Sequence, residues 1–584
     1  MKYCLWASLV LAIAAALSST GCRSHPEASR PIRIRWSHDP ENLDPLVLPN
    51  QQASDAANLL YCGLLQYDLL QDKVVPLLVE AFPTVTPVGD SLTRLSFRLR
   101  PQARWDDGQP VLAQDIDFTL KLMFCPGLPN EGARLQFAFI EALRLDDADP
   151  RRFTLVCRGQ SPELAKRAGD FPVLSEASLD PEHRLRALSL TQLQNRPASA
   201  PADSMLAGFA RRYQAVFQKP GPGYIAGCGP YDLVSWEKDQ YLHFKRKPNW
   251  WADQIQPWPE MLSAYPPQLE YAIIPDDATA SLALQRGEVD LYAAVPAREF
   301  QRLQRMASLR EKLAFYSAPS YDVVTAGFNT RRPALADPAT RRALSRLFDA
   351  AGLLAATQLG TGTRTVGLIS PADRANYNDS LPLTPFDPKA AGQLLQAAGW
   401  QRQPAGGWQR MRRGAKPQLL QLKLRYRSDE ATFETAALQF RAAAAQLGIP
   451  VVLQPTEASL LNPALHSGDF DLYVRTLKGN PFVFNFAPIL HSESVGQGNM
   501  TGYGTPASDQ LIEAVARAET PAQKAMLLRR FQARLQDDMP LVPLFFLPTR
   551  VVASRDLTGL HVSGLKPGYM ATTIRRTSPS ATAP

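Results

Sequence analysis

Residues 97–118 read FRLRPQARWDDGQPVLAQDIDF. This stretch is the most distinctive signal for the fold in the chain. Residues 92–99, which overlap its start, carry a β-strand signal. A tight turn is then predicted at residues 105–108, because Gly108 permits a positive φ and aspartate hydrogen-bonds its own backbone. These residues specify a fold rather than a ligand.

Length and composition limit the class of protein. At 584 residues the chain is too long for one ordinary core, so several domains are expected. Hydrophobic residues make up 45% and charged residues 20%, which excludes a wholly disordered or fibrous chain. The 50 prolines, where an average composition gives about 29, predict many loops and short elements and exclude a helical bundle.

The net charge of +8 is small for a chain of this size. The basic residues are scattered rather than clustered, so no nucleic-acid partner is expected.

Strand and helix signals alternate after about residue 270, whereas strands dominate before it. Asp337 and Asp387 each precede a proline, a pattern typical of helix starts, and a longer Ala-rich helix is predicted at residues 434–447. The pattern predicts an α/β chain of several domains. The predicted strands cover residues 32–36, 92–99, 152–157, 231–236, 241–245, 269–274, 323–329, 419–426, 451–454 and 541–546.

The N-terminus resembles a bacterial lipoprotein signal. Lys2 precedes a short apolar run at residues 5–17, and small residues then lead to Cys22. In such signals the cysteine is acylated and becomes the mature N-terminus, so Cys22 is the expected lipid attachment site. Ser19 departs from the usual leucine, and an ordinary signal with an incidental Cys22 is the alternative. Residues 1–22 are thus a signal peptide, and residues 23–32 a tether.

Export would permit disulfides among four remaining cysteines, Cys62, Cys125, Cys157 and Cys228. Four cysteines allow three pairings, between which the sequence does not choose. No CxxC pair exists, so zinc is not expected, and one or two structural disulfides stay open.

The sequence contains none of the common motifs for catalysis, metal binding or phosphate binding. No two of the seven histidines lie three to five residues apart, and neither a GxSxG elbow nor a phosphate-binding loop occurs. Residues 221–226 match GxGxxA only formally, within a Gly/Pro-rich loop. Adjacent acidic pairs such as Asp106-Asp107 point to opposite faces of a strand and suit turns better than catalysis. We therefore expect no enzyme, no metal site and no cofactor.

The order of motifs resembles the extracytoplasmic solute-binding proteins of ABC importers, in the family that binds oligopeptides, dipeptides and nickel. The resemblance covers about residues 33–570. Its motifs are residues 42–45 (NLDP), 59–67 (LLYCGLLQY), 75–81 (VPLLVEA), 97–118, 227–231 (GCGPY), 245–251 (KRKPNWW), 284–290 (LQRGEVD), 328–329 (FN) with Asp337 and 341–343 (RRA), 387–399, 468–471 (GDFD) and 538–543 (DMPLVP).

The resemblance implies the two-lobed periplasmic-binding-protein fold, in the class that has an extra domain, with mixed sheets and a hinge between the lobes. Ligand contacts to both lobes would drive closure. The implied domains are domain I at residues 33–62, 225–318 and 542–573, the extra domain II at 63–224, domain III at 319–541, and a disordered tail at 574–584.

The ligand site departs from the family's pattern. Peptide-binding members carry a tryptophan and then an aspartate that pairs with the peptide's ammonium group. Here Leu477 takes the tryptophan position and Asn480 the aspartate position, while Lys478 and Arg475 add positive charge if they face the cleft. The alternatives are solvated surface for the two basic residues and an alignment shifted by one or two positions. The departure predicts that a free peptide N-terminus is not the main recognition element.

The resulting hypothesis is a lipid-anchored, extracytoplasmic receptor. It would be a monomer that captures a peptide or another small polar solute and delivers it to ABC permease subunits. The alternative is a structural or signalling lipoprotein that kept this fold without a role in transport.

Overall fold

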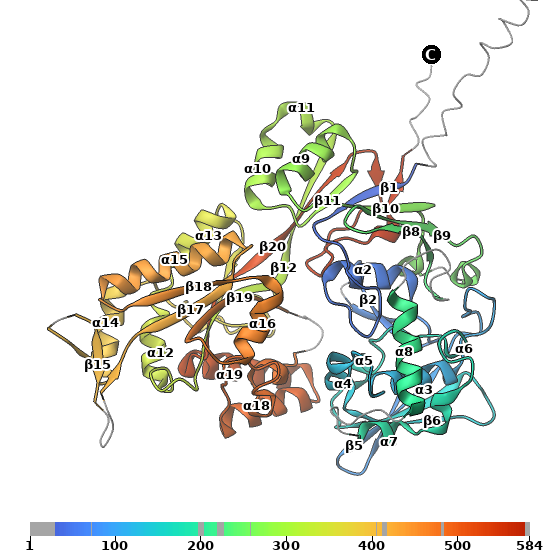
Figure 1. Ribbon diagram of the computed structural model, residues 1–584, viewed down its shortest axis with the longest axis horizontal. Coiled ribbons are helices and arrows are strands. Elements are labelled where there is room, and N and C mark those ends of the chain that lie inside the picture. The colour runs from blue at the N-terminus through green and yellow to red at the C-terminus, as the bar shows by residue number, and fades with distance from the viewer. Residues whose placement is uncertain are drawn as a thin grey trace, which may run out of the picture.

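A computed structural model describes residues 30–71, 73–196, 204–218, 227–256, 259–404, 406–411, 417–479 and 484–577. Two lobes face each other and are linked by two long strands, β12 (Leu313–Phe328) and β20 (Leu541–Ser554) (Figure 1). We call residues 30–312 and 555–577 the first lobe and residues 329–540 the second lobe.

One mixed sheet runs through both lobes. β1 pairs in parallel with β10 and β11, and β17 pairs in parallel with β18 and β19, whereas β12 and β20 are antiparallel. The α/β fold with mixed sheets is therefore confirmed. Within the described residues the sheet has 11 strands, in the order β18 (Val451–Thr456), β17 (Leu422–Arg427), β19 (Leu472–Lys478), β12, β20, β11 (Leu291–Ala293), β1 (Ile32–Trp36), β10 (Gln268–Ile273), β9 (Tyr241–Arg246) and β8 (Tyr231–Glu237), with β13 (Thr363–Arg364) beside β20.

The link between the lobes is weakest at one point of the sheet. The register of β12 against β20 breaks between Pro319 and Val323. Pro319 lies opposite Pro548, and neither residue has a backbone N–H to donate. The Ser320 hydroxyl donates to the Leu547 carbonyl at 2.5 Å. The crossing strands are thus least bonded here, where we place the hinge.

A smaller, four-stranded sheet forms the core of the extra domain in the first lobe. Just after β5 the predicted turn is present, since the Gly108 N–H donates to the Trp105 carbonyl at 2.9 Å and Gly108 has a φ of 82°. The elements are β4 (Thr84–Val88), β5 (Leu92–Arg98), β7 (Arg152–Arg158) and β6 (Ile140–Leu145), with α3 (Ala113–Leu122), α4 (Glu131–Phe137), α5 (Leu164–Arg167), α6 (Glu176–Leu179), α7 (Leu190–Gln194) and α8 (Ser204–Gln218).

The other elements complete the two lobes. Those of the first lobe are α2 (Gln51–Leu60), β2 (Leu65–Asp68), β3 (Lys73–Pro76), α9 (Asp277–Arg286), α10 (Ala297–Arg305), α11 (Ala307–Arg310), β21 (Leu557–Thr558) and β22 (Arg575–Arg576). Those of the second lobe are α12 (Pro338–Ser345), α13 (Ala350–Gln358), α14 (Pro388–Ala397), β14 (Gln401–Arg402), β15 (Trp408–Arg410), β16 (Gln418–Leu419), α15 (Ala431–Gln446), α16 (Ala458–His466), α17 (Ala487–Leu490), α18 (Pro506–Arg517) and α19 (Pro521–Asp538).

The predicted helix starts are present. The Asp337 side chain accepts a hydrogen bond from the Ala339 N–H at 2.9 Å, and Asp387 accepts one from the Ala390 N–H at 2.8 Å. The Ala-rich helix α15 begins at Ala431, three residues before the predicted start.

Each lobe has its own hydrophobic core. One large cluster fills the first lobe, from Ile32 through the extra domain to Ile574. The second lobe is filled by separate clusters around Phe440 and Phe531. Within the described residues no apolar cluster joins the two lobes, so each lobe can move as a unit.

The ordered chain extends further toward the C-terminus than predicted. Ile574 is fully buried, and Arg575–Arg576 pair with β21. Arg576 also pairs with Asp290 at 2.9 Å, which fixes this end. The expected tail therefore starts no earlier than residue 578, and the other domain boundaries stay predictions. In the described ranges no helix has both the length and the apolar character needed to cross a membrane.

Candidate functional site: two pockets across the interlobe space

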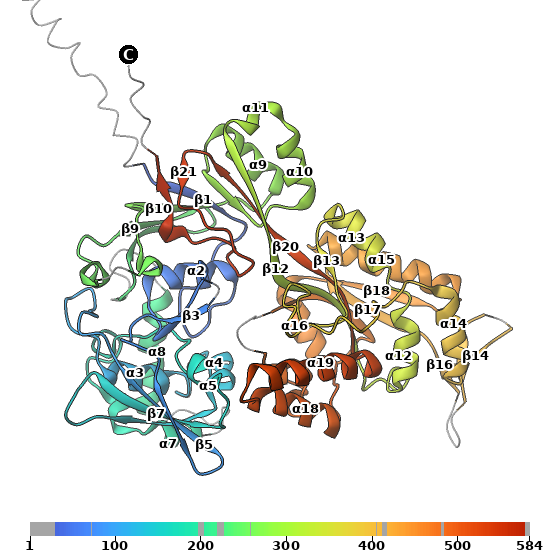
Figure 2. The same cartoon turned by 180° about the vertical axis from the view of Figure 1, so that it is seen from behind.

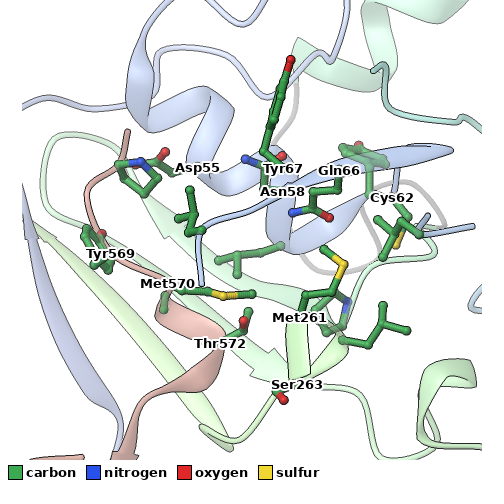
Figure 3. Close-up of a pocket in the computed structure, with 18 of the residues that line it drawn as sticks. Asp55, Asn58, Cys62, Gln66, Tyr67, Met261, Ser263, Tyr569, Met570 and Thr572 are labelled. Atoms are coloured by element: carbon green, nitrogen blue, oxygen red, sulfur yellow. The ribbon is translucent and has the colours of Figure 1, made fainter. Parts of the chain in front are cut away.

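A pocket of about 230 Å³ opens on the first lobe (Figure 3). We call it the first-lobe pocket. Its wall combines acidic, amide, aromatic and thioether side chains, which suits a ligand with both polar and apolar parts. It is lined by Asp55, Asn58, Leu59, Tyr61, Cys62, Gln66, Tyr67, Leu69, Leu77, Asp170, Pro230, Trp250, Met261, Leu262, Ser263, Tyr271, Lys566, Pro567, Tyr569, Met570, Ala571 and Thr572.

Helix α2 carries Asp55 into this wall. The helix begins after Asn50, whose side chain accepts a hydrogen bond from the Ala53 N–H at 2.9 Å. Ala56 and Leu59 are buried in the lobe core and fix the rotation of the helix. Asp55 is held within this buried part of the helix and is only 8% exposed.

Asp55 has a neutral hydrogen-bond partner. The Gln51 side-chain amide donates to Asp55 Oδ1 at 2.8 Å. Burial raises the pKa of Asp55 to about 7, against the lowering effects of this hydrogen bond and of the Lys478 and Lys566 charges. Within the described residues no lysine or arginine forms an ion pair with Asp55. The carboxylate is therefore buried without a partner of opposite charge in contact.

A second carboxylate, Asp170, lines the same pocket. Asp170 is exposed at the pocket wall. Two acidic groups therefore face one small volume.

A smaller pocket of about 120 Å³ lies on the second lobe beside the hinge strands. We call it the second-lobe pocket. The end of β19 supplies Leu477 and Lys478, and α17 and the segment before it supply aromatic and aliphatic side chains. It is lined by Tyr321, Val323, Leu368, Ile369, Ser370, Asp373, Leu477, Lys478, Gly479, Phe484, Asn485, Phe486, Ile489 and Phe546.

Charged residues of the two pockets lie close together, so both pockets open onto the same space between the lobes. Lys566 of the first-lobe pocket pairs with Asp322 on hinge strand β12 at 2.7 Å. Burial lowers the pKa of Lys478, and the neighbouring Lys566 charge lowers it further, while Asp322 and Asp55 act in the opposite direction. Lys478 on β19 lies directly opposite Asp322 on β12, so Lys478 of the second lobe and Lys566 of the first lobe approach the same residue.

The lobes also touch at a point away from the hinge. Lys524 on α19 forms an ion pair with Glu163, the residue that precedes α5 of the extra domain. Figure 2 shows α18 and α19 opposite α5. The Lys524 ammonium also lies 5.2 Å from the ring centre of Phe484, which lines the second-lobe pocket. We call the Lys524–Glu163 pair the latch, and burial lowers the pKa of Lys524 to about 8.

Comparison with known proteins identifies the family. Residues 73–494 match the model described as "Bacterial extracellular solute-binding proteins, family 5 Middle". The chain belongs to this family. It is a solute-binding protein of ABC importers, so the expectation of a non-enzymatic extracytoplasmic receptor is confirmed.

Several relatives match along most of their length. Protein XP55 of Streptomyces lividans is 26% identical over 545 residues, which cover 91% of this chain and 88% of XP55. The oligopeptide-binding protein OppA of Bacillus subtilis is 20% identical over 472 residues, which cover 80% of this chain and 79% of OppA. The structure of the oligopeptide-binding protein AppA from Bacillus subtilis, in complex with a nonapeptide, has a TM-score of 0.73 at 17% identity and covers 95% of this chain and 100% of AppA. The two-lobed fold is thereby confirmed.

Three of the five predicted site residues of this family 5 protein lie in the described part of the structure. Leu477 and Lys478 line the second-lobe pocket. Arg475 lies further back on β19, where its carbonyl accepts a hydrogen bond from Thr325, and it lines neither pocket. Asn480 and Cys22 lie outside the described residues. A ligand-binding role for the first three stays a prediction.

Sequence reasoning missed Asp55, Asp170 and the latch. One signal for Asp55 was available, because it sits between small residues in ASDAANLL, one turn before Leu59. The latch had no such signal, since Glu163 and Lys524 are ordinary charged residues far apart in the chain.

All four described cysteines are buried free thiols, and Cys62 Sγ donates to the Cys228 carbonyl at 3.3 Å. In the part of the chain that the structure describes, no group of three or more His, Cys, Asp or Glu residues is placed to hold a metal.

Proposed function

We propose that this solute-binding protein captures a peptide or peptide-like solute between its lobes and delivers it to an ABC permease while an acylated Cys22 anchors it to the membrane. The observation that carries the proposal is the pair of pockets on opposite lobes, which are linked by the hinge strands and by the latch. A ligand that contacts both pockets favours the closed arrangement, because its binding energy is gained only when both lobes reach it.

Two further points support a peptide. Apolar side chains line both pockets, but the charges differ, since two carboxylates and Lys566 line the first pocket and Asp373 and Lys478 line the second, which suits a solute with charged and apolar parts. The solved relative AppA is described in complex with a nonapeptide.

Small-angle scattering tests capture and closure together. The purified protein is measured with a defined mixture of tri- to pentapeptides and, as a control, with the same mixture hydrolysed to amino acids. We expect the radius of gyration to fall only with the peptides. Saturable binding without compaction would contradict a closing cleft. Failure to bind any peptide would favour a structural or signalling lipoprotein of the same fold.

The predicted ligand contacts can be tested separately. We propose that Asn480 stands where peptide-binding relatives carry an aspartate, with Lys478, Leu477 and Arg475 nearby on β19. Asn480→Asp is then expected to strengthen binding of free-amine peptides by up to about tenfold, because a charge-assisted hydrogen bond is stronger than a neutral one. N-acetylated peptides should not share this gain in titration calorimetry. A wild type that already prefers the free amine by tenfold would contradict this role of Asn480.

A further inference from the structure

Asp55 is a buried acid that the described part of the protein leaves without a cation in contact. It is 8% exposed, lines the first-lobe pocket, and is held by the neutral Gln51 amide. A buried carboxylate is costly unless a positive group neutralises it. Because Asp55 lines a cavity and is not enclosed in a packed core, a bound molecule can reach its carboxylate and supply the missing positive charge.

The nearby lysines do not already fill this role. Among the described residues that line the first-lobe pocket, Lys566 is the only basic one, and it pairs with Asp322 at 2.7 Å. Lys478 belongs to the second lobe and lines the other pocket. The pocket therefore holds two carboxylates, Asp55 and Asp170, against one lysine that is engaged by the hinge strand.

We propose that the first-lobe pocket binds an organic cation, an ammonium or guanidinium group of the solute, whose N–H donors contact the Asp55 carboxylate. The proposal rests on the proposed function and names the chemistry of its ligand. Asp170 adds negative charge on another wall of the pocket, and Met261, Met570 and Trp250 offer apolar contact for the carbon chain that carries the cation. We expect a basic side chain to supply the cation, because Asn480 in place of the family's aspartate predicts that the terminal amine is not the main recognition element.

The titration of Asp55 supports this assignment and supplies a readout. With a pKa raised to about 7, Asp55 is partly protonated near neutral pH. A bound cation favours the ionised form, so binding near pH 7 is expected to release protons and to strengthen as the pH rises. The charged or titratable groups that act on Asp55 or feel its charge are Lys478, Lys566, Tyr271 and Tyr569.

The probes are four tripeptides that separate the two sources of charge. They are Ala-Lys-Ala, Ala-norleucine-Ala and the N-acetylated form of each. Titration calorimetry in buffers of different ionisation enthalpy gives both affinity and proton release. We expect at least tenfold weaker binding of the acetylated norleucine peptide, which has no cation, than of at least one charged peptide. The two singly charged peptides show whether the amine or the side chain occupies the pocket.

Variants of the chain assign the preference to Asp55. Asp55→Asn is expected to reduce the preference for charged peptides to about threefold or less and to abolish proton release. Asp55→Glu should keep part of the preference and part of the proton release. Asp44→Asn is the matched control, because Asp44 is a buried carboxyl of the same lobe with a pKa raised to about 6, but it binds Tyr213 and does not line the pocket. The control should keep the cation preference.

The possible failures are distinguishable. Equal binding of all four peptides, or an unchanged preference in Asp55→Asn, overturns the cation site and leaves the peptide receptor standing. A loss of preference in Asp44→Asn as well as Asp55→Asn also overturns it, because the effect is then general to the lobe. If none of the four peptides binds at millimolar concentration, the peptide receptor and the cation site both fail.

Discussion

Removing the latch should shift the equilibrium between lobe arrangements without a change in either lobe. Glu163→Gln removes the negative partner of Lys524, and the two side chains are only 12% and 17% exposed. Exposed ion pairs contribute about 0–1 kcal/mol, whereas breaking a fully buried pair costs about 3–5 kcal/mol because a charge is left unpaired. For this mostly buried pair we expect about 1–2 kcal/mol. That value lowers the ratio of latched to unlatched molecules by roughly 5- to 30-fold.

Single-molecule fluorescence energy transfer between a dye on each lobe measures this ratio in the absence of solute. Glu141→Gln is the matched control, because Glu141 pairs with Arg158 at 2.9 Å inside the extra domain. The exchanged pair, Glu163→Lys with Lys524→Glu, should restore most of the latched population. An unchanged distance distribution in Glu163→Gln, or no recovery in the exchanged pair, would refute the idea that this contact holds the lobes.

Three further predictions concern other parts of the chain. Cys22→Ser should release the protein from the membrane fraction and abolish incorporation of labelled fatty acid, and a variant that stays bound would contradict the lipid anchor. Asp55→Asn should raise the free energy of unfolding at pH 8 by on the order of 2–4 kcal/mol, because the wild-type pKa rises from 3.8 to about 7 on folding and wild-type stability therefore falls as the pH rises from about 4 to about 7. Urea unfolding at pH 5 and pH 8 measures this, and a variant less stable than wild type at pH 8 would oppose it. Oxidised glutathione should join Cys62 to Cys228, because Cys62 Sγ donates to the Cys228 carbonyl at 3.3 Å and the two residues are therefore neighbours. The disulfide reagent takes up the two electrons, and a non-reducing peptide map without this cross-link would exclude the pairing.

The fold was largely predictable because its signals are local. Caps at Asp337 and Asp387 and the turn at residues 105–108 depend on residues within a few positions of each other. Prediction failed on the long crossing strands, where only residues 323–329 and 541–546 carried strand signals. β12 begins earlier, at Leu313, and β20 continues to Ser554. The prolines at 319 and 548 interrupt the local pattern, while pairing between the two strands and with β11 overrides it.

The site was less predictable because its parts meet only in three dimensions. The first-lobe pocket combines α2 with residues around Met261 and with the segment 566–572 near the end of the chain. Nothing in the local sequence of Lys566 indicates that it pairs with Asp322. Leu477 and Lys478 were identified only through their position in a family motif. In the structure they lie on β19, which borders the second-lobe pocket.

The arrangement of charges suggests how binding is coupled to closure. In the described residues Asp55 lacks a contacting cation, the charged form of Lys478 is destabilised by burial and by Lys566, and the latch forms an ion pair between the lobes away from the hinge. The unliganded protein thus bears two electrostatic costs that face the same interlobe space. A solute cation in the first-lobe pocket removes the first cost. In the resulting ion pair the charges of the solute cation and of the Asp55 carboxylate cancel, so the pair exerts little net field on Lys478 of the second lobe. Closure therefore depends on the contacts of the solute with the second-lobe pocket, because that part of the binding energy is gained only when both lobes reach the solute.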